Sequence, residues 1–314
     1  MKSVQILQFS YDPHTAGEFP LDLEKLFPKG HTLAVEVGCG NGEFLVEWAK
    51  INQDWNFVGV ELSIASAERF MTRVFKNGLQ NVIFVRDDAR FVLRELFPNE
   101  SVKQVMLNFP DPWPKEKHRS RRIIDTRFVQ TLSVILEKDG LFDLFTDQQW
   151  YAQDAEKIFK ESEVFSVLNI QRNPQRITST KYERKWKEQF RHIYHLRAIK
   201  KKKLHIKRVL ENSSMPHFIG KKKLKSEFIQ QLKGLEKIEK TKVFKVKEIF
   251  EKKDDQAFLL RTVTVDEDYL QTFFILVASH EQGFIVKLDQ GFQPYRTPAV
   301  KWAVEVIGKI LIEK

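Results

Sequence analysis

The chain has 314 residues, of which 42% are hydrophobic, and it carries a formal net charge of +10. This length accommodates one large domain or two moderate ones, and the composition is that of a folded protein rather than a disordered one. No apolar run approaches the roughly 18 residues of a membrane span, and the first ten residues lack the pattern of a signal peptide, so we expect a cytoplasmic protein.

Cys39 is the only cysteine, which excludes an intramolecular disulfide and a multi-cysteine metal site. The positive charge is concentrated in one stretch: residues 200–240 hold 13 Lys and Arg residues against 4 acidic ones. Such a run favours a polyanion or a membrane surface as partner, although a solvated linker has the same composition.

The first clear element is the buried strand Leu33–Val37, which runs into glycines at positions 38, 40 and 42 and then into a helix. A dinucleotide site usually has the spacing G-x-G-x-x-G, whereas the spacing here is G-x-G-x-G. Glu36 and Glu43 also make this turn acidic. A cationic nucleoside without phosphate, such as S-adenosylmethionine, therefore fits better than a pyrophosphate.

Strands alternate with helical stretches through the first 199 residues, which predicts βαβ units, a parallel sheet and an α/β fold. The expected strands are Leu33–Val37, Asn56–Glu61, Val82–Val85, Val105–Phe109, Leu141–Phe145, Val164–Leu168 and Ile193–Ile199. The expected helices are Glu43–Lys50, Ile64–Asn77, Arg90–Phe97, Arg122–Lys138 and Trp150–Glu161.

Acidic residues follow the second and third strands. Glu61 lies 19 positions after Gly42, where a carboxylate can accept both hydroxyls of a ribose. Asp88 follows the third strand and can accept from an adenine amino group. Because ligands of open α/β sheets lie at the carboxyl ends of the strands, we expect these acids to share one site.

The fourth strand leads into Asn108-Phe109-Pro110-Asp111-Pro112-Trp113-Pro114-Lys115. Three prolines make this loop rigid, so one carboxylate and one indole are presented to whatever lies over the strand ends. A guanine ring can stack on Trp113 while Asp111 accepts from its N–H groups. Basic residues follow directly and would contact a phosphate backbone: Lys115, Lys117, His118, Arg119, Arg121 and Arg122. A second basic and aromatic stretch, 172–191, fits single-stranded or splayed bases.

With these motifs the chain resembles the bacterial tRNA (guanine-N7)-methyltransferases over about residues 30–199. The resemblance implies a Rossmann-like class I methyltransferase fold with a seven-stranded mixed sheet, S-adenosylmethionine as donor, S-adenosylhomocysteine as product, and no metal. It implies transfer to N7 of guanine 46 in the variable loop of tRNA. The implied donor site comprises Glu36, Gly38, Gly40, Gly42, Glu61, Asp88 and Asn108. The implied guanosine site comprises Asp111, Lys115, Asp147, Thr180, Lys181, Tyr182 and Glu183, and Asp111 would be the catalytic residue. Glu116 interrupts the basic cluster and weakens one phosphate contact.

Guanine N7 has a free lone pair, so its methylation removes no proton and needs no strong general base. Alignment and electrostatics then account for catalysis. The expected role of Asp111 is to favour the positive charge that develops on the purine by accepting from N1–H or N2–H.

Residues 200–314 lie outside the resemblance. We expect a methyltransferase domain over 1–199, a basic helical linker over 200–240, and a small α+β module over 241–314. The strands expected in that module are Val243–Phe250, Phe258–Val265, Thr272–Ser279 and Phe284–Leu288, and its closing helix is Thr297–Ile312. The extension either contacts tRNA through the basic run or stabilises the first domain, and we favour RNA contact. The expected partner is tRNA, without a membrane, and the protein is expected to be a monomer or a homodimer.

Two other functions are compatible with parts of the chain. A nicotinamide-dependent dehydrogenase has the wrong glycine spacing and leaves the proline-rich loop unexplained. A non-catalytic RNA-binding module gains nothing from carboxylates that face a polyanion.

Overall fold

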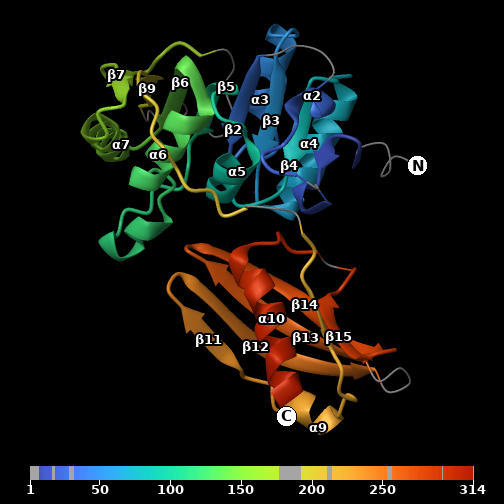
Figure 1. Ribbon diagram of the computed structural model, residues 1–314. Helices are drawn as coiled ribbons and strands as arrows, with labels where there is room; N and C mark the ends of the chain where they lie inside the picture. The colour runs from blue at the N-terminus through green and yellow to red at the C-terminus, as the bar shows by residue number, and fades with distance from the viewer. Residues whose placement is uncertain are drawn as a thin grey trace. The chain divides into compact units, whose positions relative to one another are not determined.

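The computed structural model describes residues 7–15, 18–27, 32–176, 192–210, 214–252, 257–291 and 293–313. The chain forms two compact units (Figure 1). The first consists of Met1–Pro13 with Pro20–Lys207, and the second of His14–Phe19 with Arg208–Lys314. No helix in the described part of the chain is long and apolar enough to cross a membrane.

The first unit is built on a mixed sheet with the strand order β1-β4-β3-β2-β5-β6-β9-β7, and β8 pairs with β9. The strands from β4 to β6 are parallel, whereas β9 runs antiparallel to β6 and β7. The seven strands expected from the sequence are all present, and the two-residue strands β1 and β8 extend the sheet. The seven strands are β2 (Leu33–Val37), β3 (Asn56–Val60), β4 (Val82–Val85), β5 (Val102–Asn108), β6 (Leu136–Thr146), β7 (Phe165–Val167) and β9 (Tyr194–Lys200). The two additions are β1 (Ser10–Tyr11) and β8 (Gln171–Arg172).

Strand order reverses between β2 and β5, because the chain runs outward from β2 through β3 and β4 and then returns to the other side of β2. This is a topological switch point, the place where open α/β sheets bind ligands. The loops that follow β2 and β5 therefore meet at the position expected for the site.

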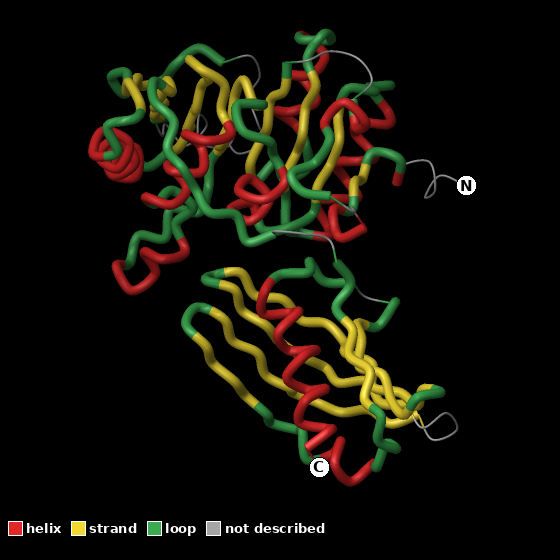
Figure 2. The backbone as a smooth tube through the Cα atoms, in the orientation of Figure 1, coloured by secondary structure: helices red, strands yellow, loops and turns green. Residues whose placement is uncertain are grey.

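Helices cover both faces of this sheet, as Figure 2 shows for the first unit. Phe44 and Trp48 of α3 and Phe70 of α4 share one apolar cluster with Phe145 of β6. Phe142, three positions earlier on β6, points to the opposite face and stacks on Phe159 of α7. The helices are α2 (Leu23–Leu26), α3 (Glu43–Ile51), α4 (Ile64–Lys76), α5 (Ala89–Leu96), α6 (Thr126–Ile135) and α7 (Gln149–Glu161), with 3₁₀ turns η1 (Pro13–Thr15) and η2 (Glu116–Arg121).

The helix expected over Arg122–Lys138 is shorter than predicted. The Asp125 side chain accepts a hydrogen bond from Phe128 N at 2.8 Å and caps α6 at its start. At the other end, Leu136 pairs with Val102 in the sheet, so residues 136–138 belong to β6.

The second unit is a six-stranded antiparallel sheet with the order β10-β15-β14-β13-β12-β11, crossed by one long helix, α10 (Figure 1). Val300, Val304 and Ile307 of α10 pack into the core of this sheet. Its elements are β10 (His217–Gly220), α9 (Ser226–Gln230), β11 (Glu236–Glu239), β12 (Lys242–Lys252), β13 (Ala257–Asp266), β14 (Tyr269–His280), β15 (Gly283–Leu288) and α10 (Pro298–Glu313). The N-terminal segment His14–Phe19 groups with this unit, where the His14 ring lies 4.1 Å from that of Tyr295.

The stretch 200–240 differs from the helical linker that was expected. It supplies the two edge strands β10 and β11 and the short helix α9. Lys200, the first lysine of the basic run, ends β9 and is buried in the first unit. Its ammonium donates to Leu136 O at 2.5 Å and to Glu100 Oε1 at 3.1 Å, so part of the basic run is neutralised locally.

Candidate active site

The glycine turn after β2 has a backbone that only glycine adopts without strain. Gly38, Gly40 and Gly42 have φ values of 67°, 51° and 74°. A Cβ on Gly38 or Gly40 would meet nothing within 4 Å, whereas one on Gly42 would lie 2.5 Å from Phe70 Cδ2. The first two glycines therefore keep the backbone accessible, and Gly42 lets α3 and α4 approach each other.

Glu36 is buried below this turn with 2% of its surface exposed. Its Oε1 accepts a hydrogen bond from Asn108 Nδ2 at 2.7 Å. Its Oε2 has no hydrogen-bond partner among the residues that the structure describes. Burial raises the pKa of Glu36 to about 8, against the smaller lowering effects of the Asn108 hydrogen bond, the Arg176 charge and the backbone N–H of Leu45. A buried acceptor without a partner is costly, so Glu36 is suited to a cationic ligand group.

Glu61, directly after β3, is hydrogen-bonded to the same turn. Its Oε2 accepts from Gly40 N at 3.1 Å, and its Oε1 accepts from Leu62 N and Ser63 N at 2.9 Å each. A carboxylate has about four lone-pair sites, so Glu61 can still accept from a ligand hydroxyl.

The third acidic position involves two adjacent residues. Asp88 is exposed, and its Oδ1 caps α5 by accepting from Arg90 N and Phe91 N. Asp87, which the sequence did not single out, is the more buried of the pair at 9% exposure. Both line the same cavity.

The proline-rich loop starts where β5 ends, and its backbone is strained at both ends. Phe109 and Trp113 have φ values of 51° and 43°, an uncommon conformation for bulky residues. Between them Asp111 is exposed and lines the cavity. Strained residues of this kind are concentrated at functional sites, where the surrounding structure holds them.

Two side chains already lie against the Trp113 ring. The Arg121 guanidinium carbon lies 4.8 Å from its ring centroid, and the His118 ring centroid lies at 5.6 Å. Stacking of a purine on Trp113 would therefore use the remaining face or displace the Arg121 side chain.

Arg122 differs from the role expected from the sequence. It is only 6% exposed, so it does not contact a phosphate backbone at the surface. Its Nε donates to Trp113 O at 3.2 Å, its Nη1 lies 3.2 Å from Asp154 Oδ2, and its guanidinium lies over the Trp150 ring at 4.9 Å. Arg122 thus fixes the proline-rich loop against α7. The other members of the basic cluster lie on or next to η2: Lys115, Lys117, Arg119 and Arg121 are exposed, and His118 is half-buried.

These elements enclose a cavity of about 830 Å³. Of the residues predicted from the sequence, it is lined by Glu36, Gly38, Gly40, Glu61, Asp88, Asn108, Asp111, Trp113, Arg121 and Asp147. Gly42 and Lys115 lie outside its lining, and Thr180, Lys181, Tyr182 and Glu183 lie outside the described residues. Within the described ranges, no group of three or more His, Cys, Asp or Glu side chains is arranged to hold a metal ion.

Two arginines near the cavity have roles that the sequence did not indicate: Arg90 was not singled out, and Arg176 was included only in the basic stretch 172–191. Arg90, at the start of α5, donates to Arg122 O and to Ser120 O and so anchors the segment after η2. Arg176 donates from Nη2 to Asn108 Oδ1 at 2.8 Å. Their partners lie 30 to 68 positions away in the chain, which no local pattern reveals.

Comparison with known proteins identifies the family. The family model Methyltransf_4, described as "Putative methyltransferase", matches residues 30–196. A protein from Thermotoga maritima named tRNA (guanine-N(7)-)-methyltransferase is 38% identical over 98% of this chain and 97% of its own length. A protein of the same name from Coprothermobacter proteolyticus is 33% identical over 94% of this chain and 91% of its own length. The crystal structure of the antibiotic-resistance methyltransferase Kmr has 16% identity and a TM-score of 0.43, covering 57% of this chain and 92% of that one. Because the family model matches more than half of the chain and both relatives align with it over nearly its full length, the chain belongs to the tRNA (guanine-N7)-methyltransferase family.

Proposed function

We propose that this protein transfers the methyl group of S-adenosylmethionine to N7 of the guanine at position 46 in the variable loop of tRNA, with S-adenosylhomocysteine as product. Both relatives described above are named tRNA (guanine-N(7)-)-methyltransferase. The observation that carries the proposal is that the carboxylates of Glu36 and Glu61 line the same cavity as Asp111 of the proline-rich loop. The single cysteine fits a reducing compartment, and we propose the cytoplasm as the place of action.

The residues fit this donor. When bound, S-adenosylmethionine supplies a methyl group on a positively charged sulfur. Glu36 Oε2 is a buried acceptor without a partner among the described residues, so it can bind an ammonium group. Gly38 and Gly40 leave space beside the turn, and Glu61 and Asp88 would accept from the ribose hydroxyls and the adenine amino group.

The acceptor base would be held by the proline-rich loop. Asp111 would accept from N1–H or N2–H of guanine and favour the positive charge that the ring gains. Asp147, which follows β6, lines the same cavity and would contact the guanosine together with Lys115. Thr180, Lys181, Tyr182 and Glu183 are proposed for the same role by resemblance alone. No residue is required to remove a proton, because N7 carries none.

The exposed basic residues around η2 would bind the tRNA backbone near the reacting base. Lys115, Lys117, Arg119 and Arg121, with His118, follow the proline-rich loop directly, so phosphate binding there would bring the base toward Asp111. We leave Arg122 out of this set because it is buried.

The test uses the full-length protein, labelled S-adenosylmethionine and unmodified tRNA transcripts. One transcript carries guanosine at position 46, and a matched one carries 7-deazaguanosine there, which keeps the N1–H and N2–H edge but lacks N7. We expect labelling of the first transcript only, and strand scission after reduction and aniline treatment should map the product to position 46. Equal labelling of both transcripts, or a product at another position, would contradict the proposal.

A further inference from the structure

The Arg176 side chain lies against three aromatic rings beside the cavity of about 830 Å³ that we propose for the methyl donor. Its guanidinium carbon is 3.9 Å from the ring centroid of Phe145, 5.0 Å from that of Phe44 and 5.4 Å from that of Phe109. Aromatic faces attract a cation, and Arg stacks on them readily. The position of this charge is therefore defined by packing from β6, from α3 and from the end of β5.

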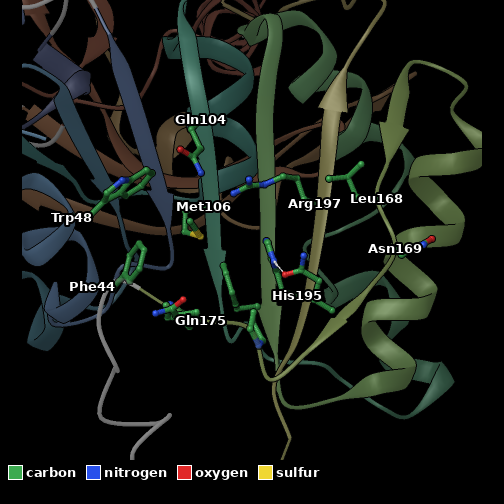
Figure 3. A pocket seen from close by; sticks show the side chains of 13 residues that line it. Phe44, Trp48, Gln104, Met106, Leu168, Asn169, Gln175, His195 and Arg197 are labelled. Atoms are coloured by element: carbon green, nitrogen blue, oxygen red, sulfur yellow. Dashed lines mark hydrogen bonds between the residues drawn. The ribbon is translucent and has the colours of Figure 1, made fainter. Parts of the chain in front are cut away.

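The ring closest to Arg176 is itself held in place. Phe145 stacks on His195 with a centroid separation of 4.2 Å and an interplanar angle of 2°. The Nε2 atom of His195 lies 2.6 Å from Oδ1 of the fully buried Asp143. Figure 3 shows the surroundings, a cavity of about 380 Å³ in which Phe44 and Trp48 of α3 face His195 and other side chains of β5 and β9.

Arg176 selects the orientation of the Asn108 amide. Its Nη2 donates to Asn108 Oδ1 at 2.8 Å, while Asn108 Nδ2 donates to Glu36 Oε1 at 2.7 Å. In the flipped amide, the oxygen would face the Glu36 carboxylate and the amino group would face the guanidinium, and both contacts would be repulsive. The N–H group of Arg176 therefore fixes the Asn108 amide in the orientation that points its Nδ2 at Glu36.

Arg176 also acts on the charge of Glu36. Burial raises the pKa of Glu36, and the Asn108 hydrogen bond and the Arg176 charge oppose this effect. Two further groups face Glu36. Glu61 raises its pKa, and the Cys39 thiol stays neutral because burial raises its own pKa well above the usual range. Arg176 is the cation that favours the ionised carboxylate.

We propose that Arg176 is a positioning residue of the donor site: it acts through Asn108 to orient Glu36, and its charge favours the ionised form of that carboxylate, which binds the cationic donor. This inference rests on the proposed function, because it takes S-adenosylmethionine as the donor. Arg176 itself contacts Asn108 and the three rings, so it is assigned no direct role in the chemistry.

The experiment compares Arg176→Gln and Arg176→Lys with a matched control, Arg172→Gln. Arg172 lies on the same segment, but its guanidinium contacts His192 instead of Asn108. Donor binding is measured by calorimetry from about pH 6 to about pH 8, since the α-amino group of the donor begins to lose its proton near the upper limit. Wild type and Arg172→Gln should bind more tightly as pH rises.

For Arg176→Gln we expect about tenfold weaker binding near neutral pH and a profile displaced upward by about one pH unit, as loss of a neighbouring opposite charge predicts. Arg176→Lys keeps the charge, so its profile should return toward that of wild type. Binding by Arg176→Lys as weak as that by Arg176→Gln would indicate a structural role alone and would overturn the inference. A profile identical to that of wild type would also overturn it.

A second comparison tests the path through Asn108. In an Asn108→Leu background, Arg176→Gln should weaken donor binding less than it does in wild type. The relay, meaning the path from Arg176 through Asn108 to Glu36, is already interrupted there, and only the direct effect of the Arg176 charge remains. Fully additive losses would show that Arg176 acts without Asn108, and would overturn the relay.

The proposed function and this inference fail in different ways. If wild type binds no S-adenosylmethionine, the proposed function fails. The relay is then tested on the ligand-free protein through the pH dependence of its thermal unfolding midpoint. Loss of stability with rising pH should extend to higher pH in Arg176→Gln than in wild type, and coincident curves would overturn the relay.

Discussion

Asn108 Nδ2 donates a hydrogen bond to Glu36 Oε1 at 2.7 Å, across 72 positions of the chain. The two residues come from neighbouring parallel strands, β5 and β2, on either side of the switch point. The contact joins the strand that leads into the glycine turn to the strand that leads into the proline-rich loop. The donor and acceptor halves of the cavity are therefore linked through side chains as well as through the sheet.

The charge of Glu36 predicts a pH-dependent affinity for the donor. Its pKa is raised from 4.5 to about 8, so at neutral pH most of the ligand-free protein holds a neutral Glu36. A cationic donor binds the ionised form, and affinity should rise with pH by up to about tenfold per pH unit below pH 8. Calorimetric titration from about pH 6 to pH 8 measures this rise, and Glu36→Gln should be weaker with a flat profile.

The same residue predicts how stability changes with pH. Between pH 4.5 and about 8 the folded state keeps a proton on Glu36 that the unfolded state has released, so stability of the ligand-free protein falls as pH rises through this window. Glu36→Gln removes this contribution, and its unfolding midpoint should depend less on pH. If the variant and wild type lose stability in parallel, Glu36 does not titrate in this range.

Asp111 is expected to act on turnover. Asp111→Asn keeps the shape of the side chain but removes its charge, and we expect methyl transfer to fall by about 10²–10³-fold, as for loss of a single transition-state contact. Donor affinity should change little, because Glu36 and Glu61 are untouched. Single-turnover transfer and donor binding are measured separately, and wild-type turnover would remove Asp111 from the active site.

The sequence predicted the parts of the site that follow from topology. Parallel strands place their carboxyl ends at one edge, so acids and turns that directly follow β2, β3 and β5 could be assigned to a common cavity. That rule does not decide which of two adjacent residues faces the cavity. Asp87 and Asp88 are adjacent, and only the path of the chain into α5 decides which is buried and which caps the helix.

The parts that were missed depend on distant partners. Arg122 belongs by sequence to a run of basic residues, and only Asp154 and Trp150 of α7 make it a buried clamp. Strand β11, Glu236–Glu239, is exposed at every position and has no apolar alternation, so its pattern is that of a linker. β11 pairs with β12 in an antiparallel register, and no residue pattern within β11 indicates this pairing.

Gly42 is predicted to be required for packing, and Gly78 provides a matched control. Both have left-handed φ values, 74° and 64°, so alanine strains the backbone by about 1–2 kcal/mol at either site. Only at Gly42 would the added Cβ also meet a neighbour, Phe70 Cδ2 at 2.5 Å. We expect Gly42→Ala to lose about 1–3 kcal/mol more than Gly78→Ala in thermal or denaturant unfolding. Equal losses would show that Phe70 moves aside at no cost.

The last prediction separates the two kinds of basic residue near the proline-rich loop. Lys117 is exposed on η2. Lys117→Gln should make tRNA affinity fall less steeply with salt: the slope of log affinity against log salt should become smaller by about 0.7–0.9, the amount for one phosphate contact. The unfolding midpoint should not change. Arg122 is buried and bonded to Trp113 O and Asp154. Arg122→Gln should therefore cost about 1–3 kcal/mol of stability and leave the salt slope unchanged. Because each variant removes one positive charge from the same stretch, a change in slope for Arg122→Gln equal to that for Lys117→Gln would mean that tRNA binding draws Arg122 out of its buried position.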